Sequence, residues 1–133
     1  MDRELIRSYS LQTERQGELD EYEAMAQVEE PGCGDVMCFY IRTKRMIVTE
    51  CTYTVTDTAC PPLKACGARA AELAIGKPVM EAYLISAGEL SAYFGGLPRE
   101  SYHCAQMAEL TLKKTLQNFA GSMTAPQPRR EEG

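Results

Sequence analysis

The residues of this chain best suited to chemistry are cysteines placed at turns and helix ends. Cys33 lies in the run Pro-Gly-Cys-Gly-Asp, where two glycines permit backbone conformations closed to other residues and Asp35 adds a carboxylate. Cys60 precedes two prolines that suit the first turn of a helix, so its thiol falls at an N-cap, where the helix dipole favours the thiolate. His103 and Cys104 come near the start of the last predicted helix. Each thiol therefore stands at the end of an element, where the backbone can present it.

Thiolates, an imidazole and a carboxylate gathered in one place would suit a thiophilic metal ion or an iron–sulfur cluster. The chain contains no CxxC pair, so zinc-ribbon and thioredoxin-like sites lose their usual support. The candidate ligands are Cys33, Asp35, Cys60, His103 and Cys104. From the residues alone, the contents of this site stay open.

Length, charge and hydropathy exclude several classes of protein. The 133 residues fit one domain, and the formal net charge of -5 comes from carboxylates spread along the chain, which leaves no basic face for nucleic acid. Apolar stretches are broken by charge within about ten residues, well short of the roughly 20 that span a bilayer. The first ten residues lack the apolar core of a signal peptide. We therefore expect a cytoplasmic protein with no membrane or nucleic-acid partner, whose six cysteines stay reduced.

The sequence predicts strands first and helices after. Residues 36–43 are dense in β-formers, Lys44-Arg45 makes a short polar turn, and residues 46–56 alternate β-branched and aromatic residues with polar ones, as in an antiparallel hairpin. Helices are predicted from Pro61 to a stop at Gly76, from Pro78 onward, and after Pro98. This order favours an α+β fold, in which helices pack on one face of a small antiparallel sheet of about three strands.

The predicted organisation has three parts. Residues 1–30 are expected to form a loosely held, partly ordered arm with one helical stretch, and residues 31–120 the folded domain. Gly88 and the Gly95-Gly96 pair interrupt the stretch before the last helix, whose apolar stripe is Ala105, Ala108, Leu112, Leu116 and Phe119. Residues 121–133 carry proline, glycine and charge with nothing to bury, so they are expected to be disordered.

Three segments resemble the cluster-binding motifs of the IscU/NifU scaffolds, that is, the NifU N-terminal domain family. The first is PGCGDVMCFYIRTK, a Cys-Gly-Asp followed by a strand. The second begins at Cys60 and continues, after fifteen residues, with Gly76-Lys77 and Glu81-Ala82. The third is GGLPRESYHCAQMAE, in which Leu-Pro is followed by His-Cys and a helix. The resemblance covers about residues 17–119, and its strength lies in the order and spacing of all three motifs.

This resemblance implies a non-enzymatic scaffold that assembles a labile [2Fe-2S] cluster. Cys33, Cys60 and Cys104 would be the cluster-binding and sulfur-receiving cysteines, Asp35 the carboxylate beside them and His103 the imidazole of the site. The implied partners are a cysteine desulfurase that supplies persulfide sulfur and apo iron–sulfur proteins that accept the cluster, and the family also allows a homodimer. Isolated protein could hold zinc instead of a cluster.

The chain also departs from the family pattern. Residues 97–101 keep only the first two positions of the Leu-Pro-Pro-Val-Lys chaperone motif, so dependence on the dedicated Hsp70-type chaperone is not expected. Cys38, Cys51 and Cys66 are additional; Cys51 and Cys66 are predicted to be small buried residues, whereas the orientation of Cys38 depends on strand register. The alternative function is zinc-dependent sulfur transfer of the SufU type, although the SufU insertion between the second and third motifs is missing. A third reading is an interaction domain with structural cysteines.

Overall fold

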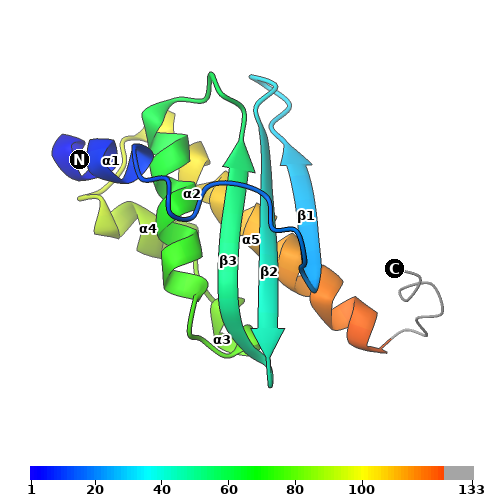
Figure 1. The fold of residues 1–133 in the computed structure, drawn as a ribbon. Coiled ribbons are helices and arrows are strands. Elements are labelled where there is room, and N and C mark those ends of the chain that lie inside the picture. Colours follow the sequence, from blue (N-terminus) through cyan, green and yellow to red (C-terminus); the bar gives the residue numbers. More distant parts are fainter. Residues whose placement is uncertain (125–133) are drawn as a thin grey trace.

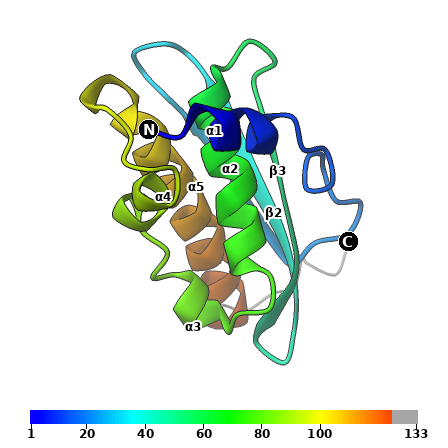
Figure 2. The ribbon, with the colours of Figure 1, turned by 90° about the vertical axis from the view of Figure 1, so that its left-hand side faces the viewer.

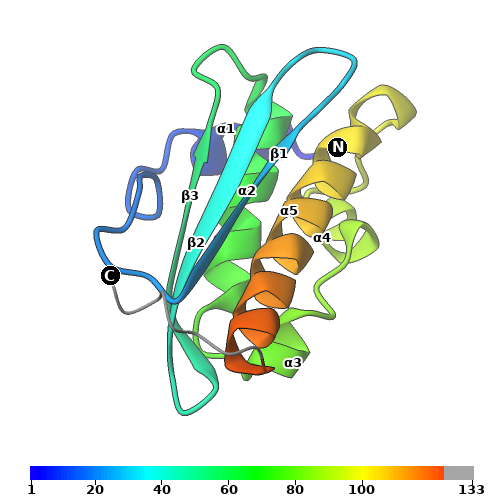
Figure 3. The ribbon, with the colours of Figure 1, turned by 90° about the vertical axis from the view of Figure 1, so that its right-hand side faces the viewer.

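The architecture is a three-stranded antiparallel sheet with helices on one face, as the residue pattern predicts (Figure 1). The structure is a computed structural model and describes residues 1–124. The strands follow one another across the sheet in the order β1-β2-β3. The elements are α1 (Arg3–Ser10), β1 (Ala24–Glu29), β2 (Val36–Lys44), β3 (Ile47–Val55), α2 (Pro61–Ala74), α3 (Val79–Ala82), α4 (Ala87–Tyr93) and α5 (Arg99–Thr124). Figures 2 and 3, seen from the left and right of Figure 1, show the strands and the helices side by side as two layers.

The β2–β3 hairpin forms as expected around a two-residue turn. Arg45 and Met46 both have positive φ, at 55° and 67°, the backbone signature of a turn whose twist matches that of the flanking strands. The register pairs Phe39 with Tyr53 and Ile41 with Cys51, and all four side chains are buried. Because side chains alternate along a strand, this set lies on one face of the sheet, toward the helices.

Two helices cover that face. The α5 stripe predicted from the sequence is buried throughout, with Leu112 and Leu116 at most 2% exposed. Helix α2 begins at Pro61, directly after its Cys60 N-cap, and its many alanines let it lie close to the sheet. The sequence therefore predicted both the start of α2 and the buried stripe of α5, because proline position and apolar spacing are local features of a sequence.

The expectation of a loosely held arm over residues 1–30 is wrong. Helix α1 packs against α2 with Ile6 and Tyr9 buried, and its first turn is capped by Asp2, whose side chain accepts a hydrogen bond from the Leu5 amide. Residues Ala24–Glu29 form β1, the first strand of the sheet. Only Ala24 and Ala26 of β1 are buried, so the strand depends on pairing with β2 and on packing against α5.

Two further boundaries differ from expectation. Gly88 does not interrupt the chain but lies inside α4, while Gly95 and Gly96, both at positive φ, do end that segment. Residues 121–124 belong to α5 and not to a disordered tail. The rest of the predicted tail, residues 125–133, lies outside the described residues.

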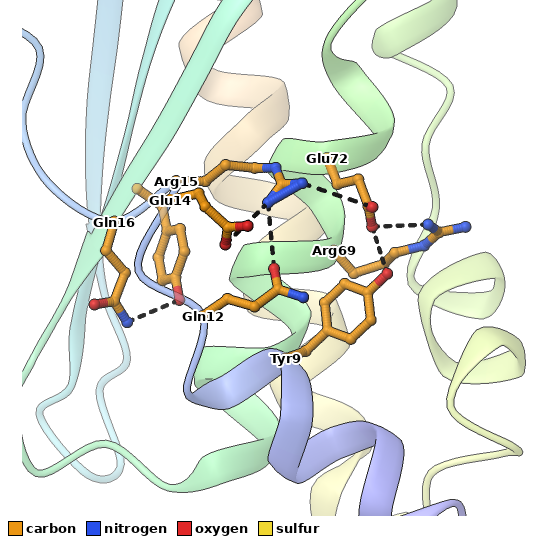
Figure 4. Close-up of polar contacts among 8 residues, drawn as sticks. Tyr9, Gln12, Glu14, Arg15, Gln16, Arg69 and Glu72 are labelled. Atoms are coloured by element: carbon orange, nitrogen blue, oxygen red, sulfur yellow. Dashed lines mark hydrogen bonds and ion pairs between the residues drawn. The ribbon is translucent and has the colours of Figure 1, made fainter.

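A polar cluster holds α1 and the following segment against α2 (Figure 4). The Tyr9 hydroxyl donates to Glu72 Oε1 at 2.5 Å and lies 2.8 Å from the Tyr93 hydroxyl. Arg69 donates to the same Glu72 oxygen at 2.9 Å, and Arg15 lies 3.6 Å from its other oxygen. Partial burial works to raise the pKa of Glu72, but the hydrogen bonds from Tyr9 and Arg69 outweigh it and lower that pKa. One carboxylate thus joins the N-terminal segment to the helical layer.

Candidate functional site

The three predicted cysteines come from three elements that meet at one end of the sheet. Strands β1 and β3 both end at the end of the sheet where β2 begins, because the pairings run antiparallel. Cys33 lies in the β1–β2 connection and Cys60 in the β3–α2 connection, and both connections are at this end of the sheet. The first turns of α5, which carry Cys104, reach the same end of the molecule (Figure 1). Residues 71 positions apart in the sequence therefore share one pole of the fold.

The loop that carries Cys33 is organised by a glutamate. Glu30 Oε1 accepts hydrogen bonds from the amides of Gly32 and Cys33, at 2.8 and 2.9 Å. The Glu30 carbonyl accepts from Gly34, whose φ of 78° suits glycine. The Cys33 thiol lies 3.4 Å from Glu30 Oε1 and 3.2 Å from Asp35 Oδ2. An exposed thiol is thus flanked by two carboxylates.

These carboxylates set the electrostatics of the loop. The Asp35 backbone amide works to lower the pKa of the Cys33 thiol, but the Asp35 side chain, desolvation and the Glu30 side chain together raise it by a larger amount. Conversely, hydrogen bonds from the Cys33 amide and thiol lower the pKa of Glu30. The loop therefore favours a charged carboxylate beside a protonated thiol until a cation or an electrophile reaches the sulfur.

The second half of the site is a pair of thiols. Cys60 Sγ lies 3.7 Å from Cys104 Sγ, and Cys104 Sγ lies 3.8 Å from His103 Nε2. Cys60 and His103 are exposed, whereas Cys104 is only 1% exposed. Burial, followed by the charge of Cys60, raises the pKa of Cys104. One thiol of the pair faces solvent and the other lies beneath it.

The two halves are near each other without forming one closed ligand set. Cys33 contributes to the raised pKa of Cys104, and His103 contributes to the lowered pKa of Glu30, so charges interact across the site. Glu30 and His103 also line a common pocket of about 190 Å³. Within residues 1–124, however, no three His, Cys, Asp or Glu side chains are arranged to hold one metal ion. The structure brings together Cys33 with Asp35, and Cys60 with Cys104 and His103.

Comparison with known proteins identifies the family of this chain. The family model described as the NifU-like N terminal domain matches residues 3–125. The chain belongs to this family.

The relatives of this NifU-like chain include named scaffolds. The iron–sulfur cluster assembly scaffold protein IscU 1 of Archaeoglobus fulgidus is 27% identical over 103 residues, which cover 77% of this chain and 66% of that protein. The chain thus spans slightly less than two thirds of that relative. The N-terminal part of a NifU-like protein from Brucella abortus superposes with a TM-score of 0.55 at 21% identity, covering 90% of this chain and 83% of that one. A crystal structure described as a hypothetical protein gives a TM-score of 0.68 at 21% identity, with 86% and 96% coverage. Both structures support the fold.

The three additional cysteines of this NifU-like chain lie outside the exposed part of the site. Cys51 and Cys66 are 1% and 0% exposed, which confirms that they are small buried residues, and burial raises the pKa of each to about 12. Cys38 alternates with the core-facing Met37 and Phe39, so it lies on the sheet face away from the helices. The charge of Cys60 adds to the raised pKa of Cys66, and the charge of Cys66 adds to the raised pKa of Cys104.

Glu30 is the residue of this site that sequence reasoning missed. Its role depends on a loop that folds the carboxylate back onto amides two and three positions later, the geometry of a side-chain-to-backbone turn. A glutamate three residues before a Gly-flanked cysteine is a weak signal, because acidic residues are common throughout this chain. Only the folded loop, in which the Glu30 carboxylate accepts hydrogen bonds from backbone amides, distinguishes Glu30 from an ordinary solvent-exposed charge.

Proposed function

We propose that this chain is a scaffold on which iron and persulfide-derived sulfur combine into a labile [2Fe-2S] cluster, which is then passed to apo-proteins. The cluster is cargo, held by Cys33, Cys60 and Cys104 with Asp35 and His103 beside them. The observation that carries the proposal is the meeting of these thiols at one end of the sheet, each from a different element. The family membership and the naming of relatives as assembly scaffolds support it.

The donor set suits a cargo that must be released. Thiolates hold iron and sulfide well, whereas a carboxylate or imidazole in the fourth position binds iron less tightly than a fourth thiolate would. Asp35 is already in contact with Cys33, and His103 with Cys104. Cys33 and Cys60 are exposed, so a cysteine desulfurase can deliver sulfur to them and an acceptor can reach the product.

Anaerobic reconstitution tests the scaffold role. The chain is incubated with ferrous iron, cysteine and a cysteine desulfurase, and visible absorbance and circular dichroism are followed. The parent is expected to develop a chromophore that moves to an apo-ferredoxin, and Ala variants of Cys33, Cys60 and Cys104 are expected to lose it. Cys38→Ala is the matched control, because Cys38 is buried on the face of the sheet that points away from the helices. Tight stoichiometric zinc without a chromophore would support zinc-dependent sulfur transfer instead.

The carboxylate has its own test. Asp35→Ala removes the oxygen donor nearest Cys33, so we expect a chromophore that forms but transfers more slowly to apo-ferredoxin. Asp20→Ala, an exposed carboxylate before β1, serves as the control. Equal transfer rates for Asp35→Ala and the parent would contradict a releasing role for this side chain.

A further inference from the structure

The contact between Cys60 and Cys104 differs from every other thiol contact described for the site. The two Sγ atoms are 3.7 Å apart, which is close to the van der Waals separation of two sulfurs. Cys60 is fixed at the N-cap of α2, and Cys104 sits within α5. Helices α2 and α5 pack directly against each other, so the separation is set by two rigid elements and not by a loop. Such a pair is placed for reaction between its own members.

We propose that Cys60 and Cys104 act as a dithiol that reduces persulfide sulfur to sulfide on the scaffold. Cys60, the exposed member, receives the sulfane sulfur, and Cys104, the buried member, resolves the resulting persulfide. This step rests on the proposed function only in that sulfur arrives as a persulfide, and it needs no iron.

The reaction balances within the pair. The Cys104 sulfur attacks the inner sulfur of the Cys60 persulfide, forming the Cys60 Sγ–Cys104 Sγ bond and breaking the bond between Cys60 Sγ and the outer sulfur. The outer sulfur takes both electrons of that bond and the proton of the Cys104 thiol, and it leaves as hydrosulfide. Two thiols are oxidised to one disulfide while sulfane sulfur is reduced to sulfide. A dithiol reductant then restores both cysteines for the next cycle.

Geometry and leaving-group chemistry both favour attack at the inner sulfur. Cys60 Sγ is the atom that Cys104 Sγ already touches, and it becomes the inner sulfur of the persulfide. Attack at the outer sulfur would expel the Cys60 thiolate, whereas attack at the inner one expels hydrosulfide, whose conjugate acid, hydrogen sulfide, is more acidic than a cysteine thiol, so that hydrosulfide leaves faster. The burial of Cys104 also hides it from external sulfur carriers and so keeps it available as the resolving thiol.

The other cysteines are less suited to this role. The Cys33 thiol contacts the carboxylates of Glu30 and Asp35, and neither can resolve a persulfide. Cys66 lies six positions after Cys60 on the same helix, about 9 Å along the axis at about 1.5 Å per residue. Cys104 is the thiol in contact with Cys60.

A single-turnover experiment without iron tests the proposal. Reduced protein is treated with one equivalent of glutathione persulfide under argon and desalted. Released sulfide and intact mass are then followed together, and peptides are mapped under non-reducing conditions. The parent is expected to release close to one sulfide per chain and to accumulate a Cys60–Cys104 disulfide. Cys104→Ser is expected to retain the persulfide on Cys60 and to release sulfide at least about tenfold more slowly, since the positioned partner is lost. Cys66→Ser is the matched control that should behave as the parent, because Cys66 is buried and lies outside the proposed cluster-binding set.

Sulfide release from Cys104→Ser at the parental rate would overturn the proposal, as would a parental disulfide that contains Cys33 or Cys66. If Cys104→Ser does not fold, as judged by circular dichroism, the disulfide map of the parent still decides the matter. The outcome is distinguishable from that of the scaffold test. A parent that forms the disulfide but no chromophore keeps this step and loses the scaffold, and a chromophore without the disulfide does the reverse.

Discussion

Replacement of Gly67 by alanine is expected to destabilise the fold, although alanine is the better helix former. Gly67 is buried in the middle of α2, where the helix crosses the sheet. A Cβ at this position would lie 2.9 and 3.0 Å from two ring carbons of Tyr53 and 3.1 Å from Met37 Cε. The Tyr53 ring is fully buried and its hydroxyl accepts a hydrogen bond from Gln16 at 3.2 Å, so the ring has little room to move.

The magnitude follows from two opposing effects. Replacing glycine by alanine in a helix interior stabilises by about 1 kcal/mol. Inserting a methyl group into a close-packed core costs about 1–3 kcal/mol, because neighbours must leave their preferred positions. With a rigid ring on one side, we expect a cost of about 2 kcal/mol and a net loss of about 1 kcal/mol. For a chain of this size, such a loss lowers Tm by about 3–5 °C.

Thermal and urea unfolding followed by circular dichroism measure this difference. Gly88→Ala is the matched control, because Gly88 is also helical and its new Cβ would meet only Tyr102 Oη at 3.8 Å and Ser86 Oγ at 3.9 Å. That variant is expected to be as stable as the parent or more stable. If Gly67→Ala equals or exceeds the stability of Gly88→Ala, close packing of α2 on Tyr53 does not limit this position, and the reasoning fails.

Three further predictions follow from the charges and thiols. Glu72→Gln should lower Tm near neutral pH, as measured by thermal melts at a series of pH values. Because the folded pKa of Glu72 lies below its unfolded value, the extra stability of the parent should be present above about pH 4.5 and should vanish as the pH falls through the folded pKa. Iodoacetamide should modify Cys60 in the native protein well before Cys51, whose pKa burial raises to about 12, as mapped by peptide mass spectrometry. Glu30→Gln should speed the alkylation of Cys33 at neutral pH, because one of the carboxylates that raise the thiol pKa loses its charge; an unchanged rate would contradict that cause.

Local sequence features predicted the central part of the fold. A run of β-formers located β2, alternation of β-branched and aromatic residues with polar ones located β3, and prolines located the starts of α2 and α5. The positions of Cys60 and Cys33 at element ends followed from the same signals. These features depend on neighbours within a few residues, so a sequence displays them directly.

The missed parts depend on contacts between distant residues. Strand β1 is short and flanked by polar residues, and it is ordered by pairing with β2 and by packing against α5. Helix α1 is held by the Tyr9–Glu72 hydrogen bond, whose partners are 63 positions apart. Ile6 and Tyr9 do lie three positions apart, as on one face of a helix, but nothing nearby in the sequence shows what that face packs against, so the segment looked like a loose arm.

The division of the site into two halves bears on how a scaffold separates its tasks. The exposed Cys33 is surrounded by carboxylate oxygens, which attract a metal cation and do not react with sulfur. The Cys60–Cys104 pair presents sulfur to sulfur, an arrangement suited to thiol–disulfide chemistry. If both tasks fell to one tight set of thiolates, iron bound early would occupy the sulfurs required for persulfide reduction. Under the proposed function, separate halves at one end of the sheet would let iron and sulfide arrive on different side chains and meet only when the cluster forms.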